Sequence, residues 1–333
     1  MGFKKIAAYS FITLVGLFLC GSILLTFAIA LLSINMPDIT KLENLVQAQS
    51  TQILDRKGEL LYTVHGEENR EYVPYKEISE YVVNATVAIE DDRFWEHEGF
   101  DMKGIFTAAL HEAFGIGAQR GGSTITQQYV KNAFLSPTRS YIRKIRELII
   151  SVRLEQAYDK EKILELYLNR IPYGNNSYGI QKAAEVYFDK DAKDLTLAES
   201  AILVSLPHAP SYYNPYGQHK FSTLTKEFTK EEAEWRNIQG EEDLKDNEFL
   251  RGMIGKEIEL SEDSKVYVKG RTDLVLNRML ELELITETQK DTALEDAQKA
   301  AFQVYREPIK APHFVLWVKE QLEDKYGKDI VEQ

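Results

Sequence analysis

The chain has 333 residues, with 52 acidic and 40 basic side chains, and a formal net charge of -12. This length is sufficient for one large domain or two modest ones with a substantial core. The acidic balance argues against a nucleic-acid partner, because such proteins normally present a basic face. With Cys20 as its single cysteine, the chain cannot form an intrachain disulfide or a cysteine-based metal cage.

The N-terminal segment has the composition of a membrane anchor. Residues 6–34 carry no charged side chain, and this run is longer than the ~20 residues that a membrane-spanning helix needs. Lys4 and Lys5 precede the run and acidic residues follow it, which places the N-terminus in the cytoplasm and the rest of the chain outside. We therefore expect residues 1–35 to form a cytoplasmic tip and a single transmembrane helix, followed by a connector at residues 36–50.

A small β-hairpin and a helix are predicted next. Residues 51–54 and 59–64 have the pattern of two short strands around a polar turn that contains glycine. Apolar side chains at helical spacing predict a helix over residues 78–89. This helix delivers Glu90 to a charged loop that runs to Asp101 and combines acids with a histidine and a Phe-Trp pair. Such loops often carry catalytic groups, although a solvated acidic turn is the alternative.

The middle of the chain is predicted to be helical. A helix at residues 104–114 is followed by a glycine-rich break at residues 115–122. Ser123 is expected to cap a helix rich in Ser, Thr and Gln, which is either a capped surface helix or a row of polar groups facing a sugar or phosphate. Further helices are expected at residues 140–158, at residues 160–170 and after a capping box formed by Thr196 and Glu199.

The C-terminal part changes in character. Residues 217–270 are rich in charge and poor in apolar anchors, so we expect a polar helical insertion or a partly disordered excursion. A helix is predicted at residues 272–284, and two more helical segments are predicted within residues 286–333. The sequence therefore predicts a mainly α-helical domain.

Two acids, Glu90 and Glu147, lie on separate predicted elements with basic residues near them in the sequence. Transfer of a sugar from a diphosphate-linked donor needs a carboxylate that takes the proton of the attacking hydroxyl, and partial burial against Phe94 and Trp95 would suit this role. It also needs cations that stabilise the leaving diphosphate. A glycosidase likewise uses two carboxylates, so these residues alone leave both reactions open.

Five segments resemble, in order, the signatures of glycosyltransferase family 51. These are the peptidoglycan glycosyltransferases, which form the lysozyme-like domain of class A penicillin-binding proteins and of monofunctional transglycosylases. The resemblance covers about residues 83–279. The segments are residues 89–101, residues 122–132, residues 143–147, residues 162–174 and residues 271–276.

The resemblance implies polymerisation of the lipid-linked precursor lipid II into glycan strands with inversion. It implies a lysozyme-like domain over residues 51–285, with Glu90 as the general base and Glu147 near the donor diphosphate. The cations that would hold the diphosphate are Lys131, Arg143 and Lys144. The full set of expected substrate-binding residues is Asp91, Phe94, Ser123, Thr124, Gln127, Gln128, Lys131, Asn132, Arg143, Lys144 and Asn169.

The same resemblance implies the partners and the location. Lipid II, the growing glycan strand, membrane lipids and other cell-wall synthesis proteins are the expected partners, at the outer face of the bacterial inner membrane. Phe114 and Ile116 would touch the bilayer surface. No metal ligand is assigned, and a divalent cation (Mg²⁺ or Mn²⁺) near Glu147 is left open.

Three alternatives remain at this point. Residues 286–333 resemble a linker toward a transpeptidase domain, so we expect the N-terminal part of a bifunctional enzyme, with a monofunctional transglycosylase as the alternative. The chain contains neither the Ser-x-x-Lys nor the Lys-Thr-Gly motif of such a transpeptidase. A lytic glycosidase of similar fold and a catalytically silent membrane scaffold are less favoured.

Overall fold

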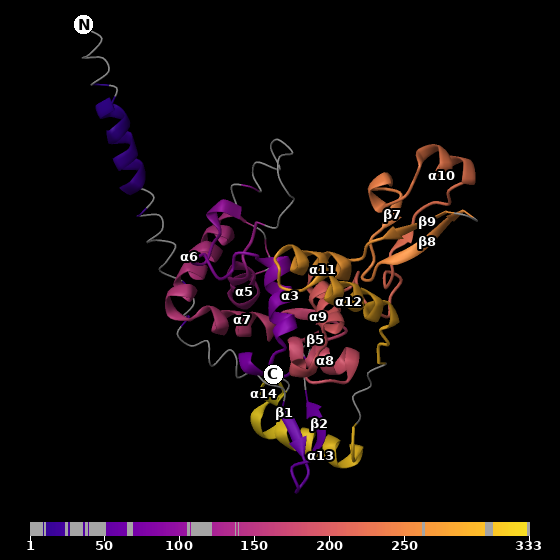
Figure 1. The fold of residues 1–333 in the computed structure, drawn as a ribbon. Helices are drawn as coiled ribbons and strands as arrows, with labels where there is room; N and C mark the ends of the chain where they lie inside the picture. The colour runs from indigo at the N-terminus through magenta and orange to yellow at the C-terminus, as the bar shows by residue number, and fades with distance from the viewer. Residues whose placement is uncertain are drawn as a thin grey trace.

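The structure is a computed structural model in which helices form the main body (Figure 1). The predicted mainly helical fold is confirmed. The residues that the structure describes are 9, 11–23, 26, 36, 39, 51–64, 69–104, 107, 122–136, 138, 140–261, 264–303 and 309–331.

The centre of the body is helix α3 (Glu80–Glu90), which packs against α9 (Leu197–Ser205) and α11 (Arg271–Glu281). Most of its buried side chains are valines and alanines, which lie in the large central core. Helix α12 (Glu287–Lys299) packs on the outer side of α9 and α11. The predicted capping box at the start of α9 is present, since the Thr196 side chain and Glu199 cap each other's backbone N–H groups.

A second group of helices lies beside α3. Helix α5 (Ile125–Phe134) packs against α6 (Tyr141–Ala157) and α7 (Lys160–Leu168). The expected cap of α5 was wrong by one residue. Thr124, rather than Ser123, forms a reciprocal capping box with Gln127.

A small three-stranded sheet completes the body. Its strand order is β3-β5-β4, with β3 parallel and β4 antiparallel to β5. Helix α8 follows this sheet and is covered on one side by α9. The bounds of these elements and of the nearby 3-10 helices are β3 (Asn69–Arg70), β4 (Pro172–Gly174), β5 (Ser177–Tyr178), α8 (Ile180–Phe188), η2 (Tyr75–Glu77), η3 (Ala192–Asp194) and η4 (Leu206–His208).

The two ends of the domain meet in a small cluster below the body (Figure 1). The predicted hairpin is confirmed as the antiparallel pair β1 (Thr51–Leu54) and β2 (Leu60–Val64). Helices α13 (Pro312–Tyr326) and α14 (Lys328–Val331) pack on this hairpin through Val315 and Val331. The segment expected to be a linker therefore contains three helices, one in the main core and two in this cluster.

The charged insertion is a folded β-rich unit, which corrects the expected helical or disordered excursion. Alternation of charged and apolar residues builds the hairpin of β8 (Lys256–Ser261) and β9 (Ser264–Val268). Together with α10 (Lys230–Arg236) this hairpin encloses its own apolar core, projecting from the body (Figure 1). The other elements of the unit are β6 (Thr223–Leu224), η5 (Glu241–Asp243) and β7 (Phe249–Leu250).

The N-terminal segment is described only in part. Residues 11–23 are helical. In the part of the chain that the structure describes, no helix has both the length and the apolar character needed to cross a membrane. Only part of the expected span at residues 6–34 is described. Most of the expected helix at residues 104–114 and almost all of the glycine-rich break lie outside the described residues, so these expectations stay predictions.

Within the insertion, Glu248 forms a bidentate ion pair with Arg236. Arg236 Nη1 and Nη2 donate to Glu248 Oε1 and Oε2 at 2.8 Å and 2.9 Å. These bonds, with help from the Lys245 backbone N–H and Lys226, lower the pKa of Glu248 to about 2. A lowered folded-state pKa stabilises the fold at pH values above the ordinary value of 4.5, and this stabilisation is lost as the pH falls toward 2.

We therefore expect Glu248→Gln to lower the hydrogen-exchange protection of the β8 and β9 amides at pH 7. The difference from the wild-type protein should shrink at pH 3. Glu257→Gln is the matched control, because the Glu257 and Lys265 side chains are both more than half exposed and such surface pairs contribute little. Equal protection in Glu248→Gln and wild type at pH 7 would contradict this role.

Candidate active site

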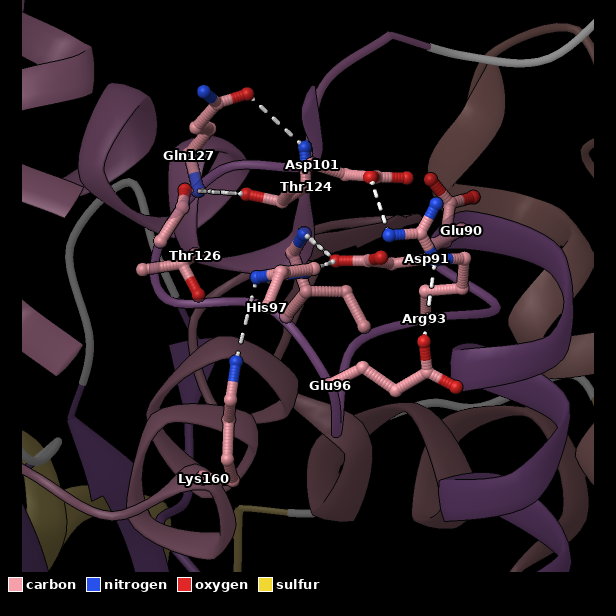
Figure 2. Close-up of polar contacts among 12 residues, drawn as sticks. Glu90, Asp91, Arg93, Glu96, His97, Asp101, Thr124, Thr126, Gln127 and Lys160 are labelled. Atoms are coloured by element: carbon pink, nitrogen blue, oxygen red, sulfur yellow. Dashed lines mark hydrogen bonds and ion pairs between the residues drawn. The ribbon is translucent and has the colours of Figure 1, made fainter. Parts of the chain in front are cut away.

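The site begins where α3 ends. Glu90 is the last residue of α3, and the next residue, Asp91, turns its carboxylate toward the start of α5 (Figure 2). Asp91 Oδ2 accepts from the Ile125 backbone N–H at 3.0 Å and lies 2.9 Å from His97 Nε2. A carboxylate at a helix N-terminus satisfies a free N–H group and is stabilised by the helix dipole. Asp91 thus joins α3 to α5 in the protein interior.

The imidazole of His97 continues this network toward α6 and α7. Its Nδ1 lies 3.4 Å from Lys160 Nζ and 3.7 Å from Glu155 Oε1. Lys160 Nζ pairs with Glu155 Oε2 at 2.7 Å, and Thr126 Oγ1 donates to Glu155 Oε1 at 2.5 Å. Every member contacts another polar group, so the charged network can stay buried and can order the loop.

Gly99 lets the loop approach α6 closely. Its φ is +90°, and a Cβ atom there would lie 2.8 Å from the Ser151 carbonyl carbon. The Gly99 carbonyl also accepts from Thr124 Oγ1 at 3.0 Å. Any larger residue would push the loop away from α6 and α5.

The aromatic pair of the loop divides between core and surface. Phe94 is fully buried, and Lys160 Nζ lies 4.6 Å from its ring centroid. Trp95 packs edge-on against Phe94 and is 47% exposed. The expected substrate contact of Phe94 does not fit this geometry, because its ring is sealed beneath the loop. Phe94 supports the loop, and Trp95 is the ring that a ligand can reach.

Two polar side chains, Gln128 and Arg271, lie next to the carboxylate of Glu90. Gln128 Nε2 donates to Glu90 Oε2 at 2.8 Å, and Arg271 Nη2 lies 3.8 Å from Glu90 Oε1. The charge of Glu90 also reaches His208, whose pKa is lowered by burial and by Arg271 and is raised in part by Glu90. His208 is therefore largely neutral at neutral pH. The Glu90 side chain remains 16% exposed, so a ligand can reach it.

Arg271 and His208 were missed as site residues in the sequence analysis. Arg271 belongs to the fifth signature segment, and this position was the available signal. The long insertion before it obscured its placement. His208 had no signal in the sequence, because only the folding of η4 brings it near Glu90 and Arg271.

The base of the insertion fixes the position of Arg271. The Arg271 backbone N–H donates to the Gly252 carbonyl at 2.9 Å. Asp273, two residues later in α11, accepts from the backbone N–H groups of Gly255 and Gly270 at 2.9 Å and 3.0 Å, and from Tyr267 Oη at 2.6 Å. Burial raises the pKa of Asp273, and these donors oppose that rise. The insertion is therefore attached rigidly to the residue that faces Glu90.

The second carboxylate, Glu147, lies on α6 and its side chain is only 3% exposed. Lys144 pairs with Glu147 and donates to Ser123 Oγ at 3.0 Å. Arg143 is partly buried beside it in sequence, and its Nε has no partner among the described residues. Helix α5 connects the two carboxylates, since Glu90 contacts Gln128 on this helix and Lys144 contacts Ser123 just before it.

Glu147 has a cationic side chain as its partner, since its carboxylate is paired with the Lys144 ammonium group. Within the described ranges no group of three or more His, Cys, Asp or Glu side chains could hold a metal ion. The divalent cation left open near Glu147 stays a prediction.

The expected polar wall divides into accessible and buried members. Gln127 is buried, and its Oε1 accepts from the Thr124 backbone N–H. Asn169 is buried, and its amide binds both backbone groups of Val73 and the Glu165 carbonyl, which gives it a structural role rather than the expected substrate contact. Asp91, Thr124 and Gln127 also form structural contacts within the interior. The accessible members are Ser123, Gln128, Lys131, Asn132, Arg143 and Lys144.

The fold and the site define a helical domain in which Gln128 on α5 contacts one glutamate, and Ser123, just before α5, contacts the lysine paired with the other. A sequence model of the transglycosylase family matches residues 57–234, just over half of the chain. The chain belongs to the transglycosylase family.

Several curated relatives share this domain. Penicillin-binding protein 1A of Neisseria cinerea is 32% identical over 330 residues, which are 99% of this chain and 36% of that protein. Penicillin-binding protein 1A of Aquifex aeolicus is 44% identical over 182 residues, or 55% of this chain and 25% of that protein. Penicillin-binding protein 1F of Bacillus subtilis is 43% identical over 173 residues, or 52% and 24%. The chain thus spans about a quarter to a third of the length of these relatives.

A solved structure also matches. The match to the crystal structure of penicillin-binding protein 1A from Haemophilus influenzae covers 85% of this chain and 25% of the crystallised chain, with a TM-score of 0.40 and 20% sequence identity.

Asp273→Ala should destabilise the domain by about 2–3 kcal/mol, because it removes a helix cap and leaves buried donors without an acceptor. Denaturant unfolding at pH 7 measures this loss. Asp246→Ala is the control. Asp246 is exposed within the insertion at residues 217–270, so its substitution should change stability by less than about 0.5 kcal/mol. Equal effects of the two substitutions would contradict the role of Asp273 in attaching the insertion to α11.

Proposed function

We propose that the chain is the glycosyltransferase part of a cell-wall polymerase that joins lipid II units into glycan strands with inversion at the anomeric carbon. The observation that carries this proposal is the environment of Glu90, a reachable carboxylate held by Gln128 and faced by Arg271. Membership of the transglycosylase family supports it. The cationic cluster around Glu147 supplies the second part that the reaction needs.

Glu90 is the proposed general base. Its Oε2 accepts from Gln128, so Oε1 is the oxygen that would take the proton of the acceptor's sugar hydroxyl. As this proton moves to Glu90, the hydroxyl oxygen bonds to the anomeric carbon of the donor. The bond from that carbon to the diphosphate breaks, and its electron pair leaves with the diphosphate.

The basic residues near the start of α5 and α6 are proposed to hold the departing diphosphate. Lys131 is exposed on α5, Lys144 is about half exposed, and Arg143 is partly buried. Positive groups fixed in place before the reaction stabilise negative charge as it develops. Glu147 and Ser123 orient Lys144 by accepting from two of its three ammonium donors, which leaves the third for a phosphate oxygen.

The proposed substrate also explains the apolar N-terminal run. A lipid-linked donor is confined to a membrane, so an enzyme anchored through residues 6–34 would work where its substrate is concentrated. We propose that the domain lies at the outer face of the bacterial inner membrane, with its N-terminus in the cytoplasm. Membrane lipids and other cell-wall synthesis proteins would be its partners there.

Glu90→Gln should abolish polymerisation of labelled lipid II, with a loss of at least about 10²-fold, because an amide cannot accept the acceptor's proton. Glu96→Gln on the same loop is the matched control, since the Glu96 side chain is 69% exposed and should leave activity unchanged. Gel analysis of the glycan products measures both.

A Glu90→Gln variant that forms glycan strands at a near-normal rate would refute the role of Glu90 as the general base. Incubating the wild-type protein with intact cell-wall sacculi distinguishes the reaction direction. Release of sugars from sacculi without polymerisation of lipid II would identify a lytic glycosidase instead.

Lys144→Ala should reduce kcat/KM for lipid II by about tenfold or more, because a hydrogen bond to a charged group contributes roughly 1.5–3 kcal/mol. Lys144→Arg should retain more activity than Lys144→Ala, since the charge remains. Lys299→Ala is the control, because Lys299 is 73% exposed on α12. Steady-state kinetics in low salt give the comparison, and full activity of Lys144→Ala would remove Lys144 from the proposed phosphate site.

A further inference from the structure

A buried tyrosine lies behind the glutamine that contacts Glu90. Tyr167, on α7, donates from its Oη to Gln128 Oε1 at 3.3 Å. Gln128 Nε2 in turn donates to Glu90 Oε2 at 2.8 Å. The Tyr167 side chain is almost fully buried, whereas Glu90 is reachable from solvent. The three residues therefore form a directed hydrogen-bond chain from the core to the proposed base.

The direction of this hydrogen-bond chain is determined at the Glu90 end, because a carboxylate can only accept and the Gln128 amide nitrogen must face it. The Gln128 carbonyl oxygen then faces Tyr167. Burial, with a contribution from the charge of Glu90, raises the pKa of Tyr167 well above its ordinary value, so the phenol keeps its proton and can donate to this oxygen.

The reversed amide would be costly. A rotated Gln128 would place its carbonyl oxygen against the Glu90 carboxylate, and two acceptors would face each other without a proton between them. Without the phenol, the Gln128 carbonyl oxygen would lose its buried partner, and the amide would be held only through its bond to Glu90.

We propose that Tyr167 is a positioning residue that holds the Gln128 amide in the orientation that fixes Glu90 Oε2 and leaves Oε1 for the acceptor's proton. Its kinetic consequence rests on the proposed function, and its structural consequence does not. Tyr167 touches neither substrate nor the reacting atoms, so it acts only through Gln128.

Tyr173 provides a matched control. It lies on β4, is fully buried, and has an Oη without a hydrogen-bond partner among the described residues. Burial and, secondly, the charge of Glu90 raise its pKa. Tyr173 therefore experiences the same carboxylate but has no bond to Gln128. Tyr173→Phe removes a buried hydroxyl in the same region and leaves the hydrogen bonds from Tyr167 through Gln128 to Glu90 intact.

The kinetic test compares Tyr167→Phe with Tyr173→Phe in lipid II polymerisation. We expect Tyr167→Phe to lower kcat about tenfold, a part of the 10²–10⁴-fold contribution of a general base, with KM changed less than about twofold. The acidic limb of its pH–rate profile should move to higher pH, because the carboxylate anion loses a fixed donor. Tyr173→Phe should match the wild-type protein. A Tyr167→Phe enzyme with wild-type kcat and pH profile would overturn the proposal.

A double-mutant cycle tests whether the effect passes through Gln128. In a Gln128→Ala background, the further change Tyr167→Phe should alter kcat by less than about twofold, because the residue through which it acts is gone. Additive losses would show that Tyr167 acts by another route and would overturn the proposal.

A measurement without activity separates this proposal from the proposed function. The side-chain amide resonances of Gln128, assigned by their loss in Gln128→Ala, should shift when Glu90→Gln is introduced into the wild-type protein and into Tyr173→Phe. This shift should fall at least about twofold in Tyr167→Phe. An unchanged shift would overturn the positioning role, whereas lack of lipid II polymerisation by the wild-type protein would reject only the proposed function.

Discussion

The contact on which the site depends is that between the Asp91 carboxylate and the first turn of α5. It connects the end of the central helix to the start of the polar helix, in an interior where an unpaired carboxylate would be costly. Because Glu90 precedes Asp91 by one residue, this contact also determines where Glu90 emerges. Gln128, one turn into α5, then lies within hydrogen-bond distance of Glu90.

Most of the polar residues at the site support the loop rather than face a ligand. His97, Lys160 and Glu155 satisfy one another below the loop, and Thr124 closes the loop through the Gly99 carbonyl. This arrangement keeps the few reachable groups in fixed positions. A base and its cations act well only if the protein has oriented them before the substrate binds. The buried network is therefore as important to the site as the exposed side chains.

The insertion illustrates how composition can mislead. Its high charge predicted a polar helical or disordered segment, yet β8 and β9 alternate charged and apolar residues and enclose a core with α10. The alternation was present in the sequence, but the charge content outweighed it. What could not be predicted was the contact at its base, where Asp273 gathers donors that are separated along the chain and thereby places Arg271 opposite Glu90.

The sequence alone determined the helical class, the hairpin, most helix boundaries and the positions of Glu90, Glu147 and the basic residues, because periodicity, caps and short motifs are local properties. Only the tertiary structure decided which of these side chains can meet a ligand. It buried Phe94 and Asn169, and it brought Arg271 and Tyr167 into the surroundings of Glu90. Accessibility and contact between distant segments depend on how helices pack, and no local pattern encodes that packing.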